Sequence, residues 1–134
     1  FYSKNFLKTI LKLSNTHNSI NVVSDQIGSP TYAMDLANVI LELILHNNIE
    51  FGIYHYSNRG SVSWFDLAKE IINISGKDID IYPISSKDFG AKAKRPSFSS
   101  LDNSKIVRLL RLENPLWKES LKQCIYQISS KEKS

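Results

Sequence analysis

The strongest constraint on the fold is a short β-branched run followed by a Gly/Pro loop and a long amphipathic helix. Residues 20–24 are rich in β-branched side chains and predict a strand. Gly28 and Pro30 then predict a loop, because a proline pushes the residue before it into an extended conformation. Over residues 32–46, apolar residues recur at helical spacing, at Ala33, Leu36, Ala37, Ile40, Leu43 and Ile44. A strand, a loop and a helix in this order are typical of an α/β chain.

The rest of the chain continues this alternation of helices and strands. Helical spacing predicts four more helices, over residues 3–14, 63–75, 104–111 and from 115 onward. Two more strands are predicted over residues 53–57 and 79–84, with irregular structure over 85–100 and a frayed polar tail over 129–134. Three short strands are few for an independent sheet, so we expect the last part of a larger one.

Several side chains are placed to begin or end these helices. Thr31 is expected to cap the helix over residues 32–46. Ser63 and Asp66 resemble a capping box with Asp in place of Glu, and Gly76 is a natural residue to end the helix that they open.

Composition excludes several classes of protein. The 134 residues are about one domain, and 42% hydrophobic with 22% charged residues is ordinary globular composition. The longest apolar-leaning stretch, over residues 39–45, is far shorter than the roughly 20 residues of a membrane-spanning helix, so no membrane partner is expected. Cys124 is the one cysteine, which excludes an internal disulfide and is compatible with a cytoplasmic location. Three histidines on three different elements give no metal-ligand spacing, so no metal is expected.

The charge of the chain is unevenly distributed. Residues 87–134 carry eleven Lys and Arg against five Asp and Glu, whereas residues 1–86 are slightly acidic. A basic third of this kind suits nucleic acid, a small anionic ligand or a solvated surface. Because no recognition-helix motif accompanies it, nucleic acid is not the expected partner.

Two loops carry the residues best suited to bind a ligand. The first spans residues 25–32, between a strand and a helix, where open α/β sheets bind their ligands. The second contains Arg95, whose planar fork suits bidentate contact with phosphate. Each also has a simpler interpretation: Thr31 caps a helix in a tight turn, and Arg95 lies in a solvated basic loop.

Four segments together resemble one enzyme family, the dTDP-4-dehydrorhamnose reductases. They are VVSDQIGSPTYAMDLA at residues 22–37, GIYHYSNRG at 52–60, SWFDLAKEI at 63–71 and RPSFSSLDNSK at 95–105. Their order and spacing agree with those of the family, and the similarity covers nearly the whole chain. The opening Lys4-Asn5-Phe6 also resembles the start of a family helix.

The resemblance implies an α/β fold, specifically the C-terminal part of an NAD(P)-binding Rossmann-type extended short-chain dehydrogenase/reductase. Residues 1–134 would then be its substrate-binding portion, without the N-terminal cofactor-binding Rossmann half. The implied reaction is reduction of dTDP-4-dehydro-L-rhamnose to dTDP-L-rhamnose by NADPH, in nucleotide-sugar and polysaccharide biosynthesis. The implied partner is the dTDP-sugar, and the implied cofactor, NADPH, would be bound by the other half.

The resemblance also nominates substrate-binding residues. Asn5 and Arg95 match positions near the diphosphate of the nucleotide sugar, and Gln26 and Thr31 are weaker candidates for contacts with substrate. No catalytic residue is expected, because no Tyr in the chain is followed by Lys four residues later. A portion cut from its partner sheet would expose an apolar face, through which a homodimer is possible.

Two alternatives remain open at this point. One is a non-catalytic regulatory or binding relative, and the other is a different nucleotide-sugar epimerase or dehydratase of the same superfamily. The chain starts with Phe1, and its one methionine is Met34, so we expect a processed chain or a piece of a longer protein.

We predict that the 134-residue chain has no reductase activity by itself. Hydride transfer requires the nicotinamide ring, the ketone and a proton donor to be held together, and the donor is missing. The measurement is NADPH oxidation with dTDP-4-dehydro-L-rhamnose and the purified chain. Measurable turnover would contradict the prediction.

Overall fold

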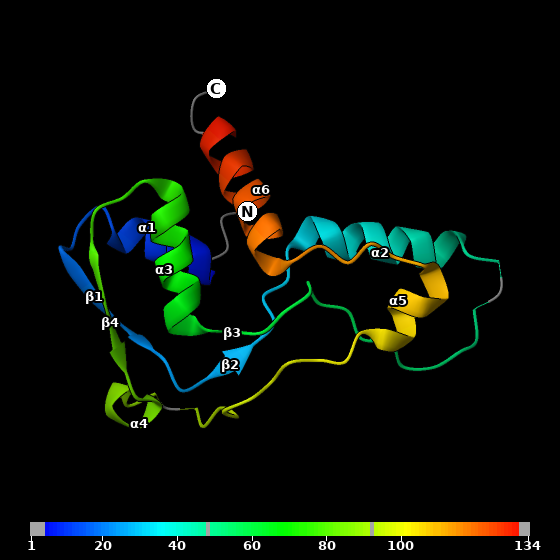
Figure 1. Ribbon diagram of the computed structural model, residues 1–134, viewed down its shortest axis with the longest axis horizontal. Helices are drawn as coiled ribbons and strands as arrows, with labels where there is room; N and C mark the ends of the chain where they lie inside the picture. The colour runs from blue at the N-terminus through cyan, green and yellow to red at the C-terminus, as the bar shows by residue number, and fades with distance from the viewer. Residues whose placement is uncertain (1–4, 48, 92, 132–134) are drawn as a thin grey trace.

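The computed structural model describes residues 5–47, 49–91 and 93–131, and it contains short strands among six helices (Figure 1). The helices in the described residues are α1 (Phe6–Leu13), α2 (Ala33–Leu45), α3 (Trp64–Ser75), α4 (Ser86–Phe89), α5 (Ser104–Leu110) and α6 (Trp117–Lys131). The strands are β1 (Ser19–Val23), β2 (Ile27–Gly28), β3 (Val62–Ser63) and β4 (Asp80–Ile84). The alternation predicts this α/β architecture correctly.

The core of the protein is built on a parallel pair of strands. β1 pairs with β4 in a register that aligns Ser19 with Asp80 and Val23 with Ile84. The helix α3 packs on this pair, and α1 and α6 pack on α3 (Figure 1). Ala68 and Ile71 of α3 are completely buried in this cluster, because the apolar side of the helix faces the strands.

A second part of the fold extends away from this core. It consists of α2, α5 and the connecting residues 49–57 (Figure 1). Val39 is the buried residue among the described residues of α2, and most of the helix surface is exposed. This part is therefore held by few apolar contacts within the chain.

The expected helix ends are partly confirmed. The Asp66 amide donates to Ser63 Oγ at 3.0 Å, and the Ser63 hydroxyl donates to the Asp66 carboxylate at 2.6 Å, which confirms the capping box. Gly76 ends α3 in the left-handed conformation with φ 64°, as expected. Thr31 does not cap α2, because its hydroxyl donates to the Ser29 carbonyl instead, at 3.4 Å.

Several expected elements differ in the structure. Residues 53–57 join no strand of the described chain, and residues 86–89 form the short helix α4 within the stretch that was expected to be irregular. The pair β2 and β3 was not expected, since two-residue strands leave no periodic signal. The last helix begins at Trp117 and continues to Lys131, so part of the expected tail is helical, while residues 132–134 lie outside the described residues. Residues 3 and 4 of the first predicted helix also lie outside them.

Replacing Ile71 with Ala tests the core. Ile71 is 0% exposed, and its truncation leaves a cavity beside the parallel strands. We expect the free energy of unfolding to fall by about 2–5 kcal/mol, as measured by urea denaturation. Ile44→Ala is the matched control because Ile44 is 72% exposed, and it should change this free energy by less than about 0.5 kcal/mol. Equal losses in the two variants would contradict this description of the core.

Candidate functional site

The structure brings together the two loops that the sequence nominates separately. The Ile27 amide donates to the Ser97 carbonyl at 2.8 Å, and the Ser99 amide donates to the Ile27 carbonyl at 2.9 Å. Residues 97–99 therefore run along one edge of β2, while β3 pairs with its other edge. Two segments that are far apart in the sequence thus form one small ladder, since Ile27 and Ser99 are separated by 72 residues.

Gly28 allows this close approach. A Cβ atom at this position would come within 3.0 Å of the Ser99 hydroxyl oxygen, which is tighter than ordinary contact. The glycine of the loop is thus explained by packing against the segment that carries Arg95.

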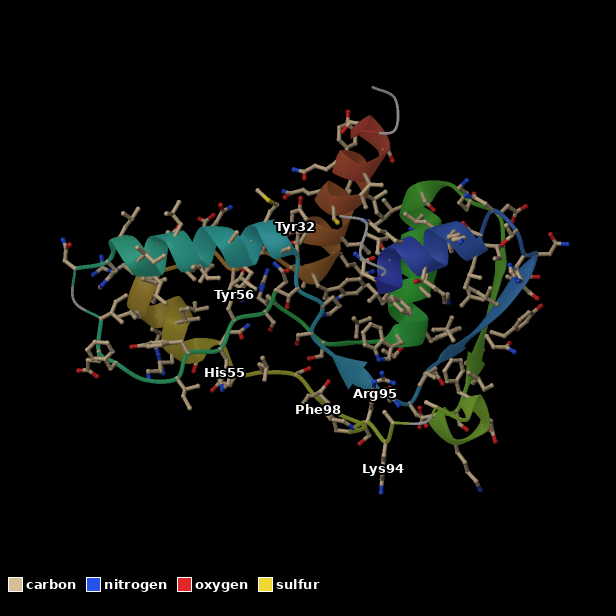
Figure 2. The ribbon with its side chains drawn as sticks, turned by 180° about the vertical axis from the view of Figure 1, so that it is seen from behind. Tyr32, His55, Tyr56, Lys94, Arg95 and Phe98 are labelled. Atoms are coloured by element: carbon tan, nitrogen blue, oxygen red, sulfur yellow. The ribbon has the colours of Figure 1, made fainter. Side chains whose placement is uncertain are left out.

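Arg95 lies on the exposed side of this ladder. In Figure 2 it lies below β2, and Lys94 extends farther out from the chain. Within the described residues the Arg95 guanidinium has no ion-pair partner, so its planar fork is open to an anionic ligand. The contact of Arg95 with a diphosphate stays a prediction.

Gln26 and Thr31 lie at two depths in the neighbouring loop. Gln26 is only 8% exposed, and its carbonyl accepts a hydrogen bond from the Trp64 amide at 3.4 Å. Thr31 is exposed at the end of the loop. A direct contact with a ligand is therefore easier for Thr31 than for Gln26 in this conformation.

Asn5 begins α1 and joins the site through an aromatic contact. Its side-chain carbonyl accepts from the Lys8 amide at 2.9 Å, which caps the helix and leaves the side-chain amide as the group able to donate to a ligand. The next residue, Phe6, packs its ring 4.7 Å from that of Trp64, whose amide bonds to Gln26. This chain of contacts connects the start of α1 to the loop.

Asp25 fixes the loop at its other end. Its carboxylate accepts from the Ser86 amide at 3.0 Å and from the Ser86 hydroxyl at 2.8 Å, at the start of α4. These bonds, the amide first, lower the pKa of Asp25 below its ordinary value. The carboxylate therefore stays charged at neutral pH and holds the corner between β1 and β2.

The central polar residue behind the loop is Asn58, which the sequence analysis does not nominate. Its side-chain oxygen accepts from the Tyr32 amide at 2.7 Å, immediately before the first residue of α2, and so holds the start of the helix where a cap was expected from Thr31. Its side-chain amide donates to the Asp35 carboxylate at 2.6 Å and to Ser120 Oγ at 2.9 Å. The Ser120 hydroxyl donates to the same Asp35 oxygen at 2.6 Å.

Two of the three residues of this cluster, Asn58 and Ser120, are buried, while Asp35 is half-buried. Asn58 is 1% exposed and Ser120 is 2% exposed. Because it joins residue 58 to α2 and α6, it holds the end of the Gln26–Tyr32 loop in place. The sequence signal that could have identified it is the Ser-Asn-Arg-Gly turn, in which Gly60 has φ 98° and packs against Trp117.

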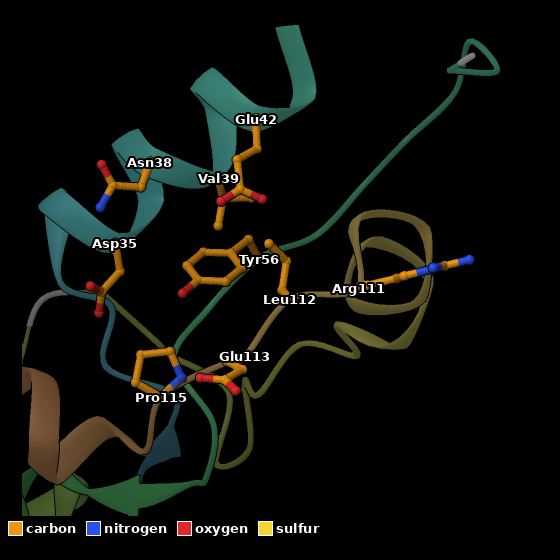
Figure 3. A pocket seen from close by; sticks show the side chains of 9 residues that line it. All are labelled: Asp35, Asn38, Val39, Glu42, Tyr56, Arg111, Leu112, Glu113 and Pro115. Atoms are coloured by element: carbon orange, nitrogen blue, oxygen red, sulfur yellow. The ribbon is translucent and has the colours of Figure 1, made fainter. Parts of the chain in front are cut away.

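A cavity of about 360 Å³ lies on the surface of α6, and a second cavity of about 300 Å³ lies beneath α2. Tyr56 lies under the helix in the second cavity, and Arg111 points away from it (Figure 3). Burial, and then the nearby charge of Asp35, raise the pKa of Tyr56, so its phenol stays protonated at neutral pH. The residues that line this second cavity are Asp35, Asn38, Val39, Glu42, Tyr56, Arg111, Leu112, Glu113 and Pro115. None of the predicted substrate-binding residues, Asn5, Gln26, Thr31 and Arg95, lines it.

The remaining candidate groups show no activated chemistry. Burial raises the pKa of the half-buried Cys124 thiol, which fits the expected packed residue. His55 is exposed on the outer side of its segment. Among the described residues, no three His, Cys, Asp or Glu side chains are grouped to hold a metal ion. In the same residues, no helix has the length and apolar character needed to cross a bilayer.

Replacing Asn58 with Ala tests the buried cluster. The substitution leaves the Tyr32 amide without its acceptor and removes a donor from Asp35, and buried unsatisfied groups cost about 1–3 kcal/mol each. We expect the free energy of unfolding to fall by about 2–4 kcal/mol in urea denaturation. Asn38→Ala, at an exposed site on α2, is the control and should change it by less than about 0.5 kcal/mol. A loss no larger than that of the control would refute the role of Asn58.

Comparison with known proteins places this arrangement in a family. The family described as the RmlD substrate binding domain matches residues 1–130. The spore coat polysaccharide biosynthesis protein SpsK of Bacillus subtilis is 38% identical over 126 residues, which are 94% of this chain and 43% of that protein. The dTDP-4-dehydrorhamnose reductase of Aggregatibacter actinomycetemcomitans is 35% identical over 131 residues, 90% of this chain and 45% of that protein.

Solved structures give the same result. The crystal structure of dTDP-4-dehydrorhamnose reductase from Bacillus anthracis in complex with NADP is 40% identical with a TM-score of 0.87, over 95% of this chain and 44% of that one. The UDP-glucuronic acid 4-epimerase of Bacillus cereus, at 19% identity and a TM-score of 0.63 over 89% of this chain and 37% of that one, shares the fold alone. The expected fold, part of an extended short-chain dehydrogenase/reductase, is confirmed.

The chain spans less than half the length of these curated relatives. The family match over residues 1–130 includes both loops of the ladder and the buried cluster behind them. The chain belongs to the RmlD substrate-binding domain family.

Proposed function

We propose that this chain is the substrate-binding portion of an NADPH-dependent reductase that converts dTDP-4-dehydro-L-rhamnose to dTDP-L-rhamnose in the cytoplasm. The observation that carries the proposal is the ladder of residues 97–99 along β2, which sets Arg95 beside the Gln26–Thr31 loop. The chain binds the dTDP-sugar, and the part of the reductase that it does not span supplies the cofactor and the proton donor. Nucleic acid and membrane have no role in this proposal.

The chemistry of a dTDP-sugar suits this surface. Its diphosphate carries negative charge, which an open guanidinium binds in bidentate fashion. The start of α1 adds free amides and the side-chain amide of Asn5 as further donors. The loop offers the Thr31 hydroxyl as a small polar group for the sugar.

The chain's own residues do not fit NADPH. A dinucleotide requires successive backbone amides in a glycine-rich turn, at the start of a helix. The positive-φ glycines of the described chain lie in four separate turns, at Gly52, Gly60, Gly76 and Gly90. The cofactor therefore belongs to the other part of the reductase, and this chain contributes orientation of the sugar.

Replacing Arg95 with Ala tests the proposal in a full-length reductase. The enzyme is a chimera in which this sequence replaces the matching part of the Bacillus anthracis reductase. A charge-assisted hydrogen bond contributes about 1.5–3 kcal/mol, so we expect the KM for dTDP-4-dehydro-L-rhamnose to rise roughly ten- to a hundred-fold. The KM for NADPH should not change, because Arg95 contacts the sugar nucleotide.

The matched control is Lys94→Ala, which removes a neighbouring cation that extends away from the ladder (Figure 2). It should leave both KM values within about two-fold, because an exposed charge at a distance is screened. An unchanged KM in Arg95→Ala would remove Arg95 from the site. A folded chimera that forms no dTDP-L-rhamnose would refute the proposed reaction.

A further inference from the structure

The parallel strands β1 and β4 end side by side, and the chain leaves them in two directions. Val23 and Ile84 are the last aligned pair, and the Ser24 amide donates to the Ile84 carbonyl at 3.0 Å just beyond it. From there one segment continues into β2, while the other enters α4 (Figure 1). Because open α/β sheets bind ligands where their parallel strands reach the carboxyl end, a contact at this point can influence a ligand site.

Asp25 joins the two segments immediately after they separate. Its two carboxylate oxygens both accept from the Ser86 amide at 3.0 Å, and one of them also accepts from the Ser86 hydroxyl at 2.8 Å. The two residues are 61 positions apart in the sequence. Asp25 therefore fixes the first residue of α4 to the start of the loop that leads into β2.

The contact with Asp25 is not required to cap α4. Ser85 already provides a cap, because its hydroxyl oxygen accepts from the Asp88 amide at 3.1 Å and its hydroxyl donates to the Asp88 carboxylate at 2.6 Å. This pair satisfies the start of the helix from within its own segment. The additional contact from Asp25 thus has a different consequence, which is to fix where α4 lies.

After α4 the chain returns to the same loop. Gly90 ends α4 with φ 65°, a left-handed conformation that glycine adopts without strain. Eleven residues after Ser86, the Ser97 carbonyl accepts from the Ile27 amide at 2.8 Å. The intervening chain is therefore a loop whose two ends are bonded to Asp25 and Ile27, and two residues of chain span at most about 7 Å.

Arg95 belongs to this loop and lies two residues before its second bonded end at Ser97. A segment that is fixed at one end samples many more conformations than a loop that is fixed at both ends. With both ends bonded, the backbone that carries the guanidinium is held beside β2 in the absence of a ligand (Figure 2). Order of this kind lowers the entropic cost of binding.

We propose that Asp25 is a positioning residue for Arg95: by holding Ser86, it closes the loop from which the guanidinium reaches the diphosphate of the sugar nucleotide. Asp25 does not contact the ligand itself, because its carboxylate is occupied by Ser86 and would repel a diphosphate. The inference rests on the proposed function, since it concerns the binding of the same substrate.

Replacing Ser86 with Pro in the chimera described above removes the contact with little change to α4. Ser86 is the first residue of this helix, where proline is well tolerated, and Ser85 has the extended conformation that a following proline requires, with φ −73° and ψ 152°. The change removes both donors to Asp25. We expect the KM for dTDP-4-dehydro-L-rhamnose to rise roughly three- to ten-fold, while kcat and the KM for NADPH stay within about two-fold.

Replacing Asp25 with Ala removes the same contact from the other side and should give the same rise in KM. If Asp25 acts through Arg95, Asp25→Ala should change this KM by less than about two-fold in a chimera that already carries Arg95→Ala. Additive effects in that double variant, or an unchanged KM in Ser86→Pro, would overturn the proposal. If Asp25→Ala does not fold, Ser86→Pro combined with Arg95→Ala decides the same question.

The matched control is Ser85→Ala. It removes the cap of α4 and leaves both donors of Ser86 in place, so the KM for the sugar nucleotide should stay within about two-fold of the parent value. A rise equal to that in Ser86→Pro would show that the stability of α4, and not its contact with Asp25, determines binding. That result would overturn the proposal.

Binding of dTDP, measured by calorimetry, separates this proposal from the proposed function. If Ser86→Pro and Asp25→Ala weaken dTDP binding in the expected way but the parent chimera forms no dTDP-L-rhamnose, the proposed reaction is wrong and the positioning role stands. If the chimera forms product and Ser86→Pro binds dTDP as tightly as the parent chimera, the positioning role is wrong and the proposed reaction stands.

Discussion

The relative positions of the loop, α2 and α6 depend on the hydrogen bonds of the Asn58 side chain. It joins three segments that have few apolar contacts with one another: the end of the Gln26–Tyr32 loop, the start of α2 and the first turns of α6. Every hydrogen-bonding group of this side chain is used, in a place from which water is excluded. A polar cluster that is fully satisfied specifies one geometry, because any displacement leaves a buried group without its partner.

This geometry also determines the position of the Gln26–Tyr32 loop and of Arg95 beside it. The loop is held behind by Asn58, at one end by Asp25, and along its edge by the backbone bonds between Ile27 and residues 97–99. Arg95 follows from that ladder, two residues before the first bonded position. Its exposed guanidinium therefore extends from a fixed backbone, which reduces the ordering that a ligand must impose.

How much the sequence predicts depends on the range of the interactions involved. Local patterns predict α3 correctly, from its capping box at Ser63 to Gly76, because those signals lie within a few residues. The same reasoning nominates both loops of the site but not their pairing, since the Ile27–Ser99 contact spans 72 residues. It assigns the cap of α2 to Thr31, whereas the start of this helix is held by a hydrogen bond from the Tyr32 amide to Asn58 in a distant segment. The predicted roles of Asn5, Gln26, Thr31 and Arg95 in substrate binding stay predictions.

The strand expected over residues 53–57 shows a different reason for disagreement. Its sequence has the alternation of a strand, and burial in the structure follows that alternation, yet it pairs with no strand of the described chain. An alternating pattern predicts an extended segment but not the strand with which it pairs, because the pattern is local. The segment is followed by Asn58, whose side chain bonds to the Tyr32 amide at the end of the Gln26–Tyr32 loop. The Ser57 carbonyl accepts from the side-chain amides of Asn103 and Asn114, so the residue beside Asn58 is held from the other side. The position of the Gln26–Tyr32 loop therefore depends on contacts that residues 57 and 58 make with three distant parts of the sequence, which no local pattern records.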